Sequence, residues 1–239
     1  DSIIDCARCH RVPIRIGVNG GSVDGKILEE CNGNKLQALK SNLAKYVRYF
    51  ESKNFDDLVL SVKSSDVTEM VEANRFLADL PYPVHLGVTE AGLSNQGIVK
   101  NSIGIGSLLL NGIGDTIRVS LTANPVEEVY AGLEILKALN LRGGVKFVSC
   151  PKCGRCSIDL ENIAKEVYDY ARTIDKNIKI AVMGCEVNGP GECRDADLGL
   201  AGANGCCVFF KNGQVYKRVK SIEAVELFKK EIELLTNDN

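Results

Sequence analysis

The chain has 239 residues, of which 45% are hydrophobic and 25% are charged, with a formal net charge of -2 at pH 7. These values predict a globular protein of one large or two modest domains, and they exclude a general attraction to nucleic acid or anionic membranes. No apolar run approaches the roughly 18 residues of a membrane span. The first residues lack a secretory signal, and the ten cysteines favour a reducing compartment and metal binding over disulfides, so we expect a cytoplasmic location.

Short β-branched runs alternate with longer amphipathic segments from residue 14 onward, which is typical of β/α units on a parallel sheet. The opening "SIIDCARC" has the pattern of the last part of an amphipathic helix. A strong helix start follows later, with Asn124 as N-cap, Pro125 at the first helical position and Glu127 at the third. The predicted strands are 14–18, 57–62, 83–88 and 115–121, and the predicted helices are 34–50, 66–79, 95–110 and 125–139.

The pattern changes after "LRGG" at 141–144, where we place a boundary between domains 1–141 and 142–239. Four β/α units are half of an eight-fold barrel and leave two strand edges unpaired, so the first domain is predicted to be a small open sheet or a fragment. The second domain is predicted to contain strands 145–149 and 178–183, a hairpin about Asn212-Gly213, and helices 158–173 and 221–235.

One face of the four predicted strands in the first domain is polar, because residues two apart on a strand share a face. On three of these strands the face carries a cation, namely Arg15, Lys63 and Arg118. If the faces converge, these cations need an anion to neutralise them, and a phosphate or diphosphate fits best. Asn19 and Ser120 on the same face would add neutral hydrogen bonds. The alternative is that each cation is an exposed residue at the end of its strand.

Two further residues near this face are candidates for catalysis. His85 lies on the polar face of the third strand, although a lone histidine in such a strand is more often a core residue. Glu90 follows the end of that strand, where barrel enzymes place reactive groups. The glycines of "SIGIGSLLLNGIGD" do not follow a strand and have the wrong spacing for a dinucleotide fingerprint, so we interpret them as sites of close helix-to-sheet packing.

The cysteines of the second domain follow strand ends. Cys150 and Cys153 come after one strand and Cys185 after another, so parallel pairing would bring the thiols together. The alternatives are unconnected core thiols and a structural zinc site. A zinc ribbon needs a second Cys-x-x-Cys pair, whereas Cys206 and Cys207 are adjacent. Three thiols with a different fourth ligand suit an iron-sulfur cluster with one unusual iron.

Six segments in this order resemble one enzyme family: "IRIGVN", "SVKSSDV", "HLGVTEAG", "GIGDTIRVSL", "CPKCGR" and "MGCEVNGPGE". Together they resemble the C-terminal two thirds of 4-hydroxy-3-methylbut-2-enyl diphosphate synthase, from the non-mevalonate isoprenoid pathway. The resemblance covers nearly the whole chain. The family's first barrel strands have no counterpart, so we expect a truncated form.

The resemblance implies the C-terminal half of a (β/α)8 barrel followed by an α/β iron-sulfur domain. It also implies a [4Fe-4S] cluster held by Cys150, Cys153, Cys185 and the carboxylate of Glu192. Cys156 and Cys193 are then extra thiols close to the site, and nothing in the sequence assigns a role to Cys206 or Cys207.

The family reaction is the two-electron reductive ring opening and dehydroxylation of 2-C-methyl-D-erythritol 2,4-cyclodiphosphate. The resemblance implies that Arg15, Asn19, Lys63, Arg118 and Ser120 bind the diphosphate. Glu90 and His85 are then candidates for proton transfer, and Glu192 is an exchangeable ligand. It further implies a homodimer that takes electrons from ferredoxin or flavodoxin. The competing interpretation is a non-catalytic module, either zinc-stabilised or electron-carrying, or an inactive fragment of the synthase.

Overall fold

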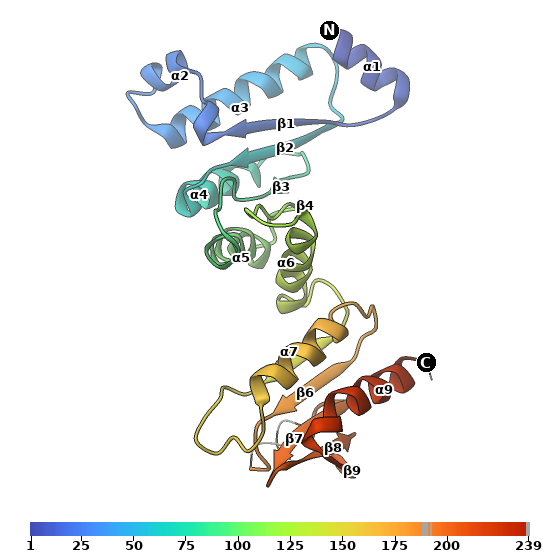
Figure 1. Ribbon diagram of the computed structural model, residues 1–239. Helices are drawn as coiled ribbons and strands as arrows, with labels where there is room; N and C mark the ends of the chain where they lie inside the picture. The colour runs from blue at the N-terminus through green and yellow to red at the C-terminus, as the bar shows by residue number, and fades with distance from the viewer. Residues whose placement is uncertain (188–190, 192, 238–239) are drawn as a thin grey trace. The chain divides into compact units, whose positions relative to one another are not determined.

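Two units make up the computed structural model of the chain (Figure 1). Unit 1 is Asp1–Leu139 and unit 2 is Asn140–Asn239, so the chain divides between Leu139 and Asn140, close to the "LRGG" segment. The structure describes residues 1–187, 191 and 193–237. No helix in these ranges is long and apolar enough to cross a membrane.

Unit 1 alternates strands with helices along the whole of its length. Its strands are β1 (Ile14–Asn19), β2 (Leu58–Lys63), β3 (His85–Leu86) and β4 (Thr116–Ile117). Its helices are α1 (Ser2–His10), α2 (Gly25–Glu30), α3 (Lys35–Ser52), α4 (Val67–Leu77), α5 (Ser94–Leu110) and α6 (Pro125–Ala138), with a 3-10 turn η1 (Gly20–Ser22). The predicted start of α6 is confirmed, because the Asn124 side chain accepts a hydrogen bond from the Val126 N–H at 3.0 Å.

The four strands of unit 1 run parallel in the order of the chain. β1 pairs with β2, and β3 pairs with β4. The two pairs are linked by a parallel bridge between Leu60 and Val84 and by the Leu60 N–H, which donates to the Pro83 carbonyl at 2.8 Å. The ladder of β3 and β4 is shorter than the predicted strands 83–88 and 115–121. Beyond it, the Arg118 N–H still donates to the Leu86 carbonyl at 2.9 Å.

The core of unit 1 lies between this sheet and its helices. Leu39, Leu60, Leu86 and Ile105 are fully buried, so strands and helices contribute to one hydrophobic cluster. At Gly104 on α5, a β-carbon would lie 2.8 Å from the Val88 side chain. The interpretation of this glycine as a site of close packing is confirmed there.

Unit 2 contains a five-stranded mixed sheet. Its order is β5 (Lys146–Ser149), β6 (Lys179–Met183), β7 (Leu198–Ala203), β8 (Cys206–Lys211) and β9 (Gln214–Lys220). β5, β6 and β7 are parallel, and β7, β8 and β9 are antiparallel. The predicted hairpin is confirmed at Asn212 and Gly213, whose φ angles of 50° and 75° suit a turn of this kind.

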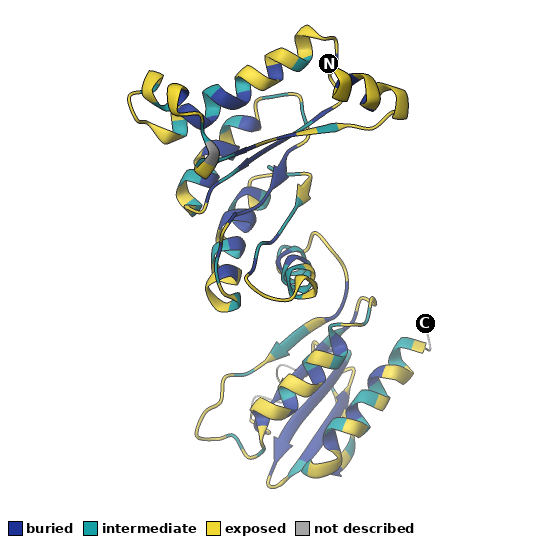
Figure 2. Ribbon diagram, turned by 45° about the horizontal axis from the view of Figure 1, so that its top comes forward, coloured by how far each residue is buried: buried dark blue, intermediate teal, exposed yellow. Residues whose placement is uncertain are grey.

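The central strands of the unit 2 sheet, β6, β7 and β8, are mostly buried, as the dark strands in Figure 2 show, whereas the edge strands β5 and β9 are largely exposed or half-buried. Residues of α7 (Leu160–Ala171) and α9 (Ala224–Asn237) pack on one face around Phe209 and Phe228, whose ring centroids are 5.1 Å apart. A second hydrophobic cluster lies on the opposite face of the sheet and includes Met183, Cys193 and Phe210. The hydrophobic effect therefore stabilises unit 2 from both sides of one sheet.

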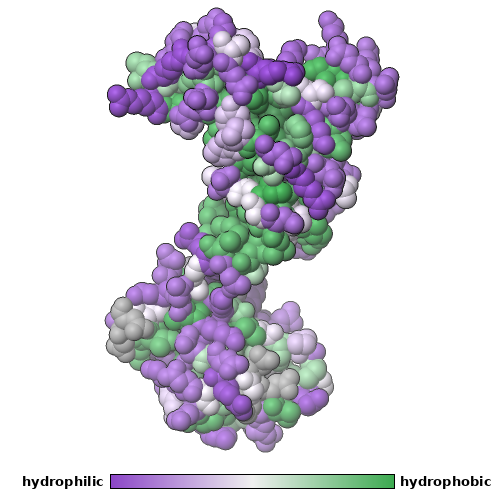
Figure 3. Space-filling model, turned by 180° about the vertical axis from the view of Figure 1, so that it is seen from behind, coloured by the Kyte–Doolittle hydropathy of each residue, from purple (hydrophilic) through white to green (hydrophobic). Residues whose placement is uncertain are grey.

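Apolar side chains also reach the surface of unit 1, and Figure 3 shows hydrophobic surface gathered on one side of it. Beside β4 and α6, a hollow of about 270 Å³ is lined mainly by apolar residues, among them Val119, Val129 and Leu133. A second hollow of about 340 Å³ lies beside α1 and β1 and includes Ile3 and Ile14. Both edges of the described sheet therefore present apolar surface to solvent.

Candidate functional site

Four basic side chains of unit 1, which we call the basic cluster, lie close enough for their charges to interact, namely Arg15, Lys63, His85 and Arg118. Burial, followed by the positive charges of Arg118 and Arg15, lowers the pKa of Lys63 to about 8. Burial, followed by Lys63, Arg15 and Arg118, lowers the pKa of His85 to about 4. The residues that strand alternation predicted to share a face thus meet, and at pH 7 the imidazole is neutral while Lys63 remains mostly protonated.

The absence of a side chain at Gly87 makes room for the Arg118 backbone, and the Lys63 stem lies beside the same glycine. Lys63 ends β2 and lies opposite Asn19 in the register of β1 and β2. A β-carbon at Gly87 would lie 2.6 Å from the Arg118 carbonyl oxygen and 3.5 Å from Cε of Lys63. Because contacts under 3.0 Å are not tolerated, residue 87 must be glycine for the Arg118 backbone to approach as it does, whereas the contact with the lysine stem is an ordinary one.

The ring of His85 is fixed by its neighbours. Nδ1 of His85 lies 2.8 Å from the Thr116 hydroxyl, and the residue is 6% exposed. The Ser61 hydroxyl donates to the His85 carbonyl at 3.0 Å. His85 is therefore a well-packed core residue and also a member of the basic cluster. The sequence had left open whether it is a core histidine or a residue of the polar face, and both descriptions apply.

Two buried asparagines on helices hold the strand ends that carry this cluster. Nδ2 of Asn74 donates to the Val62 carbonyl at 2.9 Å, directly before Lys63. Nδ2 of Asn101 donates to the Ser120 carbonyl at 3.1 Å. Both asparagines are 0% exposed. The sequence analysis did not identify these asparagines. The signal that could have found them is an amide side chain at a helix position that is otherwise apolar: Asn74 lies four residues after Met70, and Asn101 lies four residues after Gly97.

Glu90 lies in a loop that is tied to strand ends on both sides. The Thr89 N–H donates to the Ser64 carbonyl at 3.2 Å, and the Thr122 N–H donates to the Gly92 carbonyl at 2.9 Å. Glu90 itself has a φ angle of 52°, which is uncommon for a residue with a side chain. Its carboxylate is exposed and has no hydrogen-bond or ion-pair partner in the part of the chain that the structure describes.

The predicted neutral donors, Asn19 and Ser120, are both partly buried. Oδ1 of Asn19 accepts a hydrogen bond from the Gly21 N–H at 3.3 Å and caps η1. Part of its bonding capacity therefore stabilises a turn beside the cluster. The carbonyl of Ser120 is held by Asn101, as described above, which fixes the backbone two residues after Arg118.

In unit 2, Cys150 and Cys185 follow neighbouring parallel strands. Cys150 comes directly after β5, and Cys185 comes two residues after the end of β6, which pairs with β5. Cys185 is buried, Cys150 is partly buried, and Cys153 is exposed. The predicted placement of the thiols at two adjacent strand ends is therefore observed. Within the described residues, however, no three His, Cys, Asp or Glu side chains are grouped so that they could hold a metal ion.

Gly184 connects these thiols through its backbone. Its N–H donates to Sγ of Cys150 at 3.2 Å, and its carbonyl accepts from the Ser157 N–H at 3.0 Å. A β-carbon at Gly184 would lie 2.8 Å from Sγ of Cys156. The loop that carries Cys150 to Cys156 thus folds directly over Gly184. Hydrogen bonds to sulfur of this kind tune iron-sulfur centres, so the thiols suit such a group in donor chemistry.

The remaining cysteines differ in their surroundings. Cys193 is 0% exposed and packs so tightly on Gly199 that a β-carbon there would lie 2.5 Å from its sulfur. Cys207 is also buried, and burial raises its thiol pKa. Cys206 donates to the Ala203 carbonyl at 2.8 Å within the β7–β8 turn. Glu192, the predicted carboxylate ligand, lies outside the described residues.

Comparison with known proteins identifies matches to both units. Residues 1–133 match the family model described as the GcpE TIM-barrel domain, and residues 146–234 match the GcpE protein C-terminal domain. The first of these matches alone covers more than half of the chain.

Curated relatives carry one name, 4-hydroxy-3-methylbut-2-en-1-yl diphosphate synthase (flavodoxin). The chain is 52% identical to the protein from Clostridium tetani over 90% of the chain and 62% of the relative. It is 50% identical to that from Clostridium acetobutylicum over 95% of the chain and 66% of the relative. It is 47% identical to that from Clostridium perfringens over 98% of the chain and 68% of the relative. The chain therefore spans about two thirds of the length of these relatives.

Proposed function

Because the chain belongs to the GcpE family through both its barrel-type and its C-terminal domain, we propose that it carries two functional parts of a 4-hydroxy-3-methylbut-2-enyl diphosphate synthase. Unit 1 binds the diphosphate of 2-C-methyl-D-erythritol 2,4-cyclodiphosphate, and unit 2 holds a [4Fe-4S] cluster. The observation that supports this best is the proximity of Arg15, Lys63 and Arg118. Burial, together with the neighbouring positive charges, lowers the pKa values of Lys63 and His85.

The cations would bind the diphosphate oxygens and leave the carbon skeleton exposed for reaction. Arg118 and Arg15 offer forked donors. Lys63 offers a compact ammonium group, and a bound dianion would keep this group protonated. Binding energy at the diphosphate is remote from the reacting carbon and oxygen, so it would orient them without taking part in bond breaking. Asn19 and Ser120 would supply neutral hydrogen bonds beside the phosphates.

Two residues would handle protons. The exposed carboxyl of Glu90, on its loop between strand ends, would donate a proton to the departing hydroxyl. His85 is neutral at pH 7 and is held by Thr116, so it would orient the substrate or relay a proton as a neutral imidazole. These roles are distinct because one side chain is solvent-exposed and the other is buried.

Cys150, Cys153, Cys185 and Glu192 would hold the cluster, which when bound supplies electrons for the reductive step. The Gly184 N–H would stabilise the Cys150 thiolate. The relatives' names include flavodoxin. We propose that flavodoxin or ferredoxin donates electrons to this protein. We also propose that the protein is a homodimer and that it works in the cytoplasm.

We further propose that unit 1 supplies the C-terminal half of a (β/α)8 barrel. Support comes from the four parallel strands in chain order and from the apolar hollows beside β4 and β1, which are the edges where further β/α units would pack. On this basis we expect little or no cyclodiphosphate turnover from the present chain alone, even with the cluster bound.

Substrate binding tests the proposal without requiring turnover. Arg118→Ala should weaken cyclodiphosphate binding about 10- to 100-fold in calorimetric titration, because a charged hydrogen bond is worth about 1.5 to 3 kcal/mol. Arg75→Ala is the control, since Arg75 pairs with Glu72 on the exposed surface of α4 at 2.6 Å. Equal affinities of the two variants and the parent chain would refute the diphosphate assignment.

The second candidate, an electron carrier or metal-stabilised module, rests on the thiols around Gly184 alone. It predicts an absorbance band near 400 nm that bleaches on reduction, together with no saturable binding of the cyclodiphosphate. Zinc in place of iron would give no band.

A further inference from the structure

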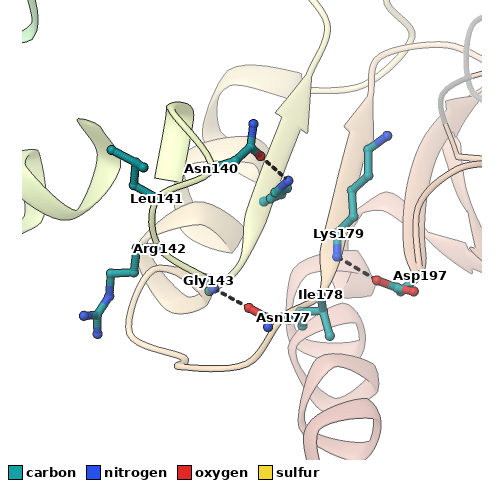
Figure 4. A pocket seen from close by; sticks show the side chains of 10 residues that line it. Asn140, Leu141, Arg142, Gly143, Asn177, Ile178, Lys179 and Asp197 are labelled. Carbon is teal, nitrogen blue, oxygen red and sulfur yellow. Dashed lines mark hydrogen bonds between the residues drawn. The ribbon is translucent and has the colours of Figure 1, made fainter. Parts of the chain in front are cut away.

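A hollow at the amino-terminal edge of the unit 2 sheet stands apart from both sites described above. It has a volume of about 400 Å³, within the range of small-molecule pockets. It lies where β5 and β6 begin, at Lys146 and Lys179, whereas the cysteines follow the ends of these strands. A strand the length of β5 separates the two places by about 13 Å. Figure 4 shows the side chains that surround it.

The lining of this hollow is rich in positive charge. Three cations line it, namely Arg142, Lys146 and Lys179. Among the described residues that line the hollow, Asp197 is the one carboxylate. Lys146 and Lys179 form no ion pair within residues 1–187, 191 and 193–237. Oδ2 of Asp197 accepts from the Lys179 backbone N–H at 2.7 Å, so a backbone donor already engages this carboxylate.

The two asparagines of the lining have their oxygens turned toward fixed donors (Figure 4). Oδ1 of Asn140 accepts from Nζ of Lys146 at 2.7 Å, and Oδ1 of Asn177 accepts from the Gly144 N–H at 2.7 Å. Because an ammonium and a backbone N–H can only donate, these bonds settle which end of each amide is oxygen. The NH₂ group of each amide therefore adds hydrogen-bond donors to a lining that already carries three cations.

Such a donor-rich lining suits a ligand that only accepts hydrogen bonds and carries negative charge. Phosphate oxygens meet both conditions, and forked guanidinium and amide donors fit them well. We propose that this hollow, bounded by Arg142, Lys146, Lys179, Asn140 and Asn177, is a binding site for a small phosphate-bearing anion. It is separate from the basic cluster of unit 1, and the proposal does not depend on catalysis or on a cluster.

The geometry also couples this site to the segment that joins the units. The Asn177 amide that lines the hollow holds Gly144, and a β-carbon at Gly143 would lie only 2.2 Å from its Oδ1. Gly144 has a φ angle of 127°, which favours glycine. An anion bound to the same amide would therefore restrain the backbone of residues 143 and 144.

Residue-resolved titration tests the site in the full chain. Inorganic pyrophosphate, added at constant ionic strength to ¹⁵N-labelled protein, should shift the Gly143 and Gly144 amide resonances saturably. Resonances around Lys63 and Arg118 would report the unit 1 cluster separately. A parallel titration with orthophosphate distinguishes the ligand: tighter pyrophosphate binding indicates a diphosphate, and equal binding indicates a monophosphate.

The decisive comparison uses two double variants with the same change of net charge. Lys146→Gln with Lys179→Gln should weaken the effect at Gly143 and Gly144 at least about tenfold. Lys220→Gln with Lys230→Gln, both exposed in the same unit, should change it less than about twofold. The single variants serve if the first pair does not fold. No saturable shift at Gly143 and Gly144, or equal weakening in both double variants, would overturn the proposal.

Discussion

His85 shows how one environment sets the charge of a residue. It is enclosed by packing and surrounded by three cations, so its pKa falls to about 4 from an ordinary value of 6.5. Lys63 responds in the same direction for the same reasons. A cluster of this kind costs stability in the absence of an anion, and the same electrostatic energy is recovered when an anion binds.

Acidification should destabilise unit 1 through His85. The unfolded chain takes up a proton near pH 6.5 and the folded chain only near pH 4, so the unfolded state binds more protons in this window. The free energy of unfolding should therefore fall as the pH drops from 6.5 toward 4. Urea denaturation across this range tests it, with His85→Gln as the variant that should flatten the dependence. NMR titration of His85 near its ordinary pKa would contradict the prediction.

Cys193 should be a packing residue rather than a ligand. Because its sulfur is fully buried against Gly199, Cys193→Ala should lower the free energy of unfolding of the cluster-free protein by about 1 kcal/mol and leave cluster absorbance unchanged. Cys156→Ser is the comparison, since a hydroxyl there keeps the contact to the Ile158 carbonyl at 3.2 Å. Loss of the absorbance band with unchanged unfolding of Cys193→Ala would make the thiol a ligand.

At the scale of elements, helices α4 and α5 do more than cover the sheet. Each presents one asparagine whose NH₂ group also bonds its own helix, Asn74 to the Met70 carbonyl and Asn101 to the Gly97 carbonyl, both at 2.8 Å. Each amide thereby locks a helix to the end of a strand that carries a cation. The helices thus hold the backbone next to Lys63 and two residues after Arg118.

Asn101→Ala should therefore affect both stability and binding. Loss of the bond to Ser120 leaves a buried carbonyl unpaired, which costs about 1 to 3 kcal/mol. Pyrophosphate binding at the basic cluster should weaken as well, because the strand end that follows Arg118 loses its anchor. Asn111→Ala, at the exposed end of α5, is the control and should change neither. Reduced stability with unchanged pyrophosphate affinity would show that the anchor does not position the site.

The elements that the sequence predicted well are those with local signals. The start of α6 was visible in Asn124 and Pro125, and the β8–β9 turn was visible in Asn212-Gly213. β7 was missed, because four of the six residues of "LGLAGA" are Gly or Ala, which have little β-propensity, and its burial between β6 and β8 decides its conformation. α2 was also missed, although the Asp24 side chain caps it by accepting from the Lys26 N–H at 3.0 Å.

The candidate site also has features that the sequence predicts and features that it does not. Alternation along single strands was enough to predict that Arg15, Lys63 and Arg118 share a face. The need for glycine at residues 87 and 184 was not predictable, because it depends on atoms from distant segments, the Arg118 carbonyl oxygen in one case and a cysteine sulfur in the other. Contacts of this kind appear only when the fold is known.

At the scale of the whole molecule, each unit has hydrophobic clusters of its own. The cluster of unit 1 contains residues from Ile4 to Ile135, and those of unit 2 contain residues from Val145 to Ile232. No buried residue of these described clusters is shared by both units. Domains with separate cores are expected to unfold as separate cooperative units.

Cluster loading should therefore stabilise one unit and not the other. Anaerobic reconstitution with iron and sulfide should raise the melting temperature of a transition that belongs to unit 2, because a ligand that binds only the folded form shifts the equilibrium. The transition of unit 1 should stay in place. Calorimetry of loaded and unloaded protein measures both, and a Cys185→Ala variant should abolish the shift. Equal shifts of both transitions would show that the units unfold together.

The separate cores also have a consequence for the order of events during protein synthesis. Translation proceeds from the amino terminus, so every residue of the unit 1 core is synthesised before Cys150. Unit 1 can then begin to fold before Cys185, the last of the three predicted thiol ligands, leaves the ribosome. The proposed cluster would require iron and sulfide only for unit 2, so a cell short of either would accumulate protein whose unit 1 is already folded.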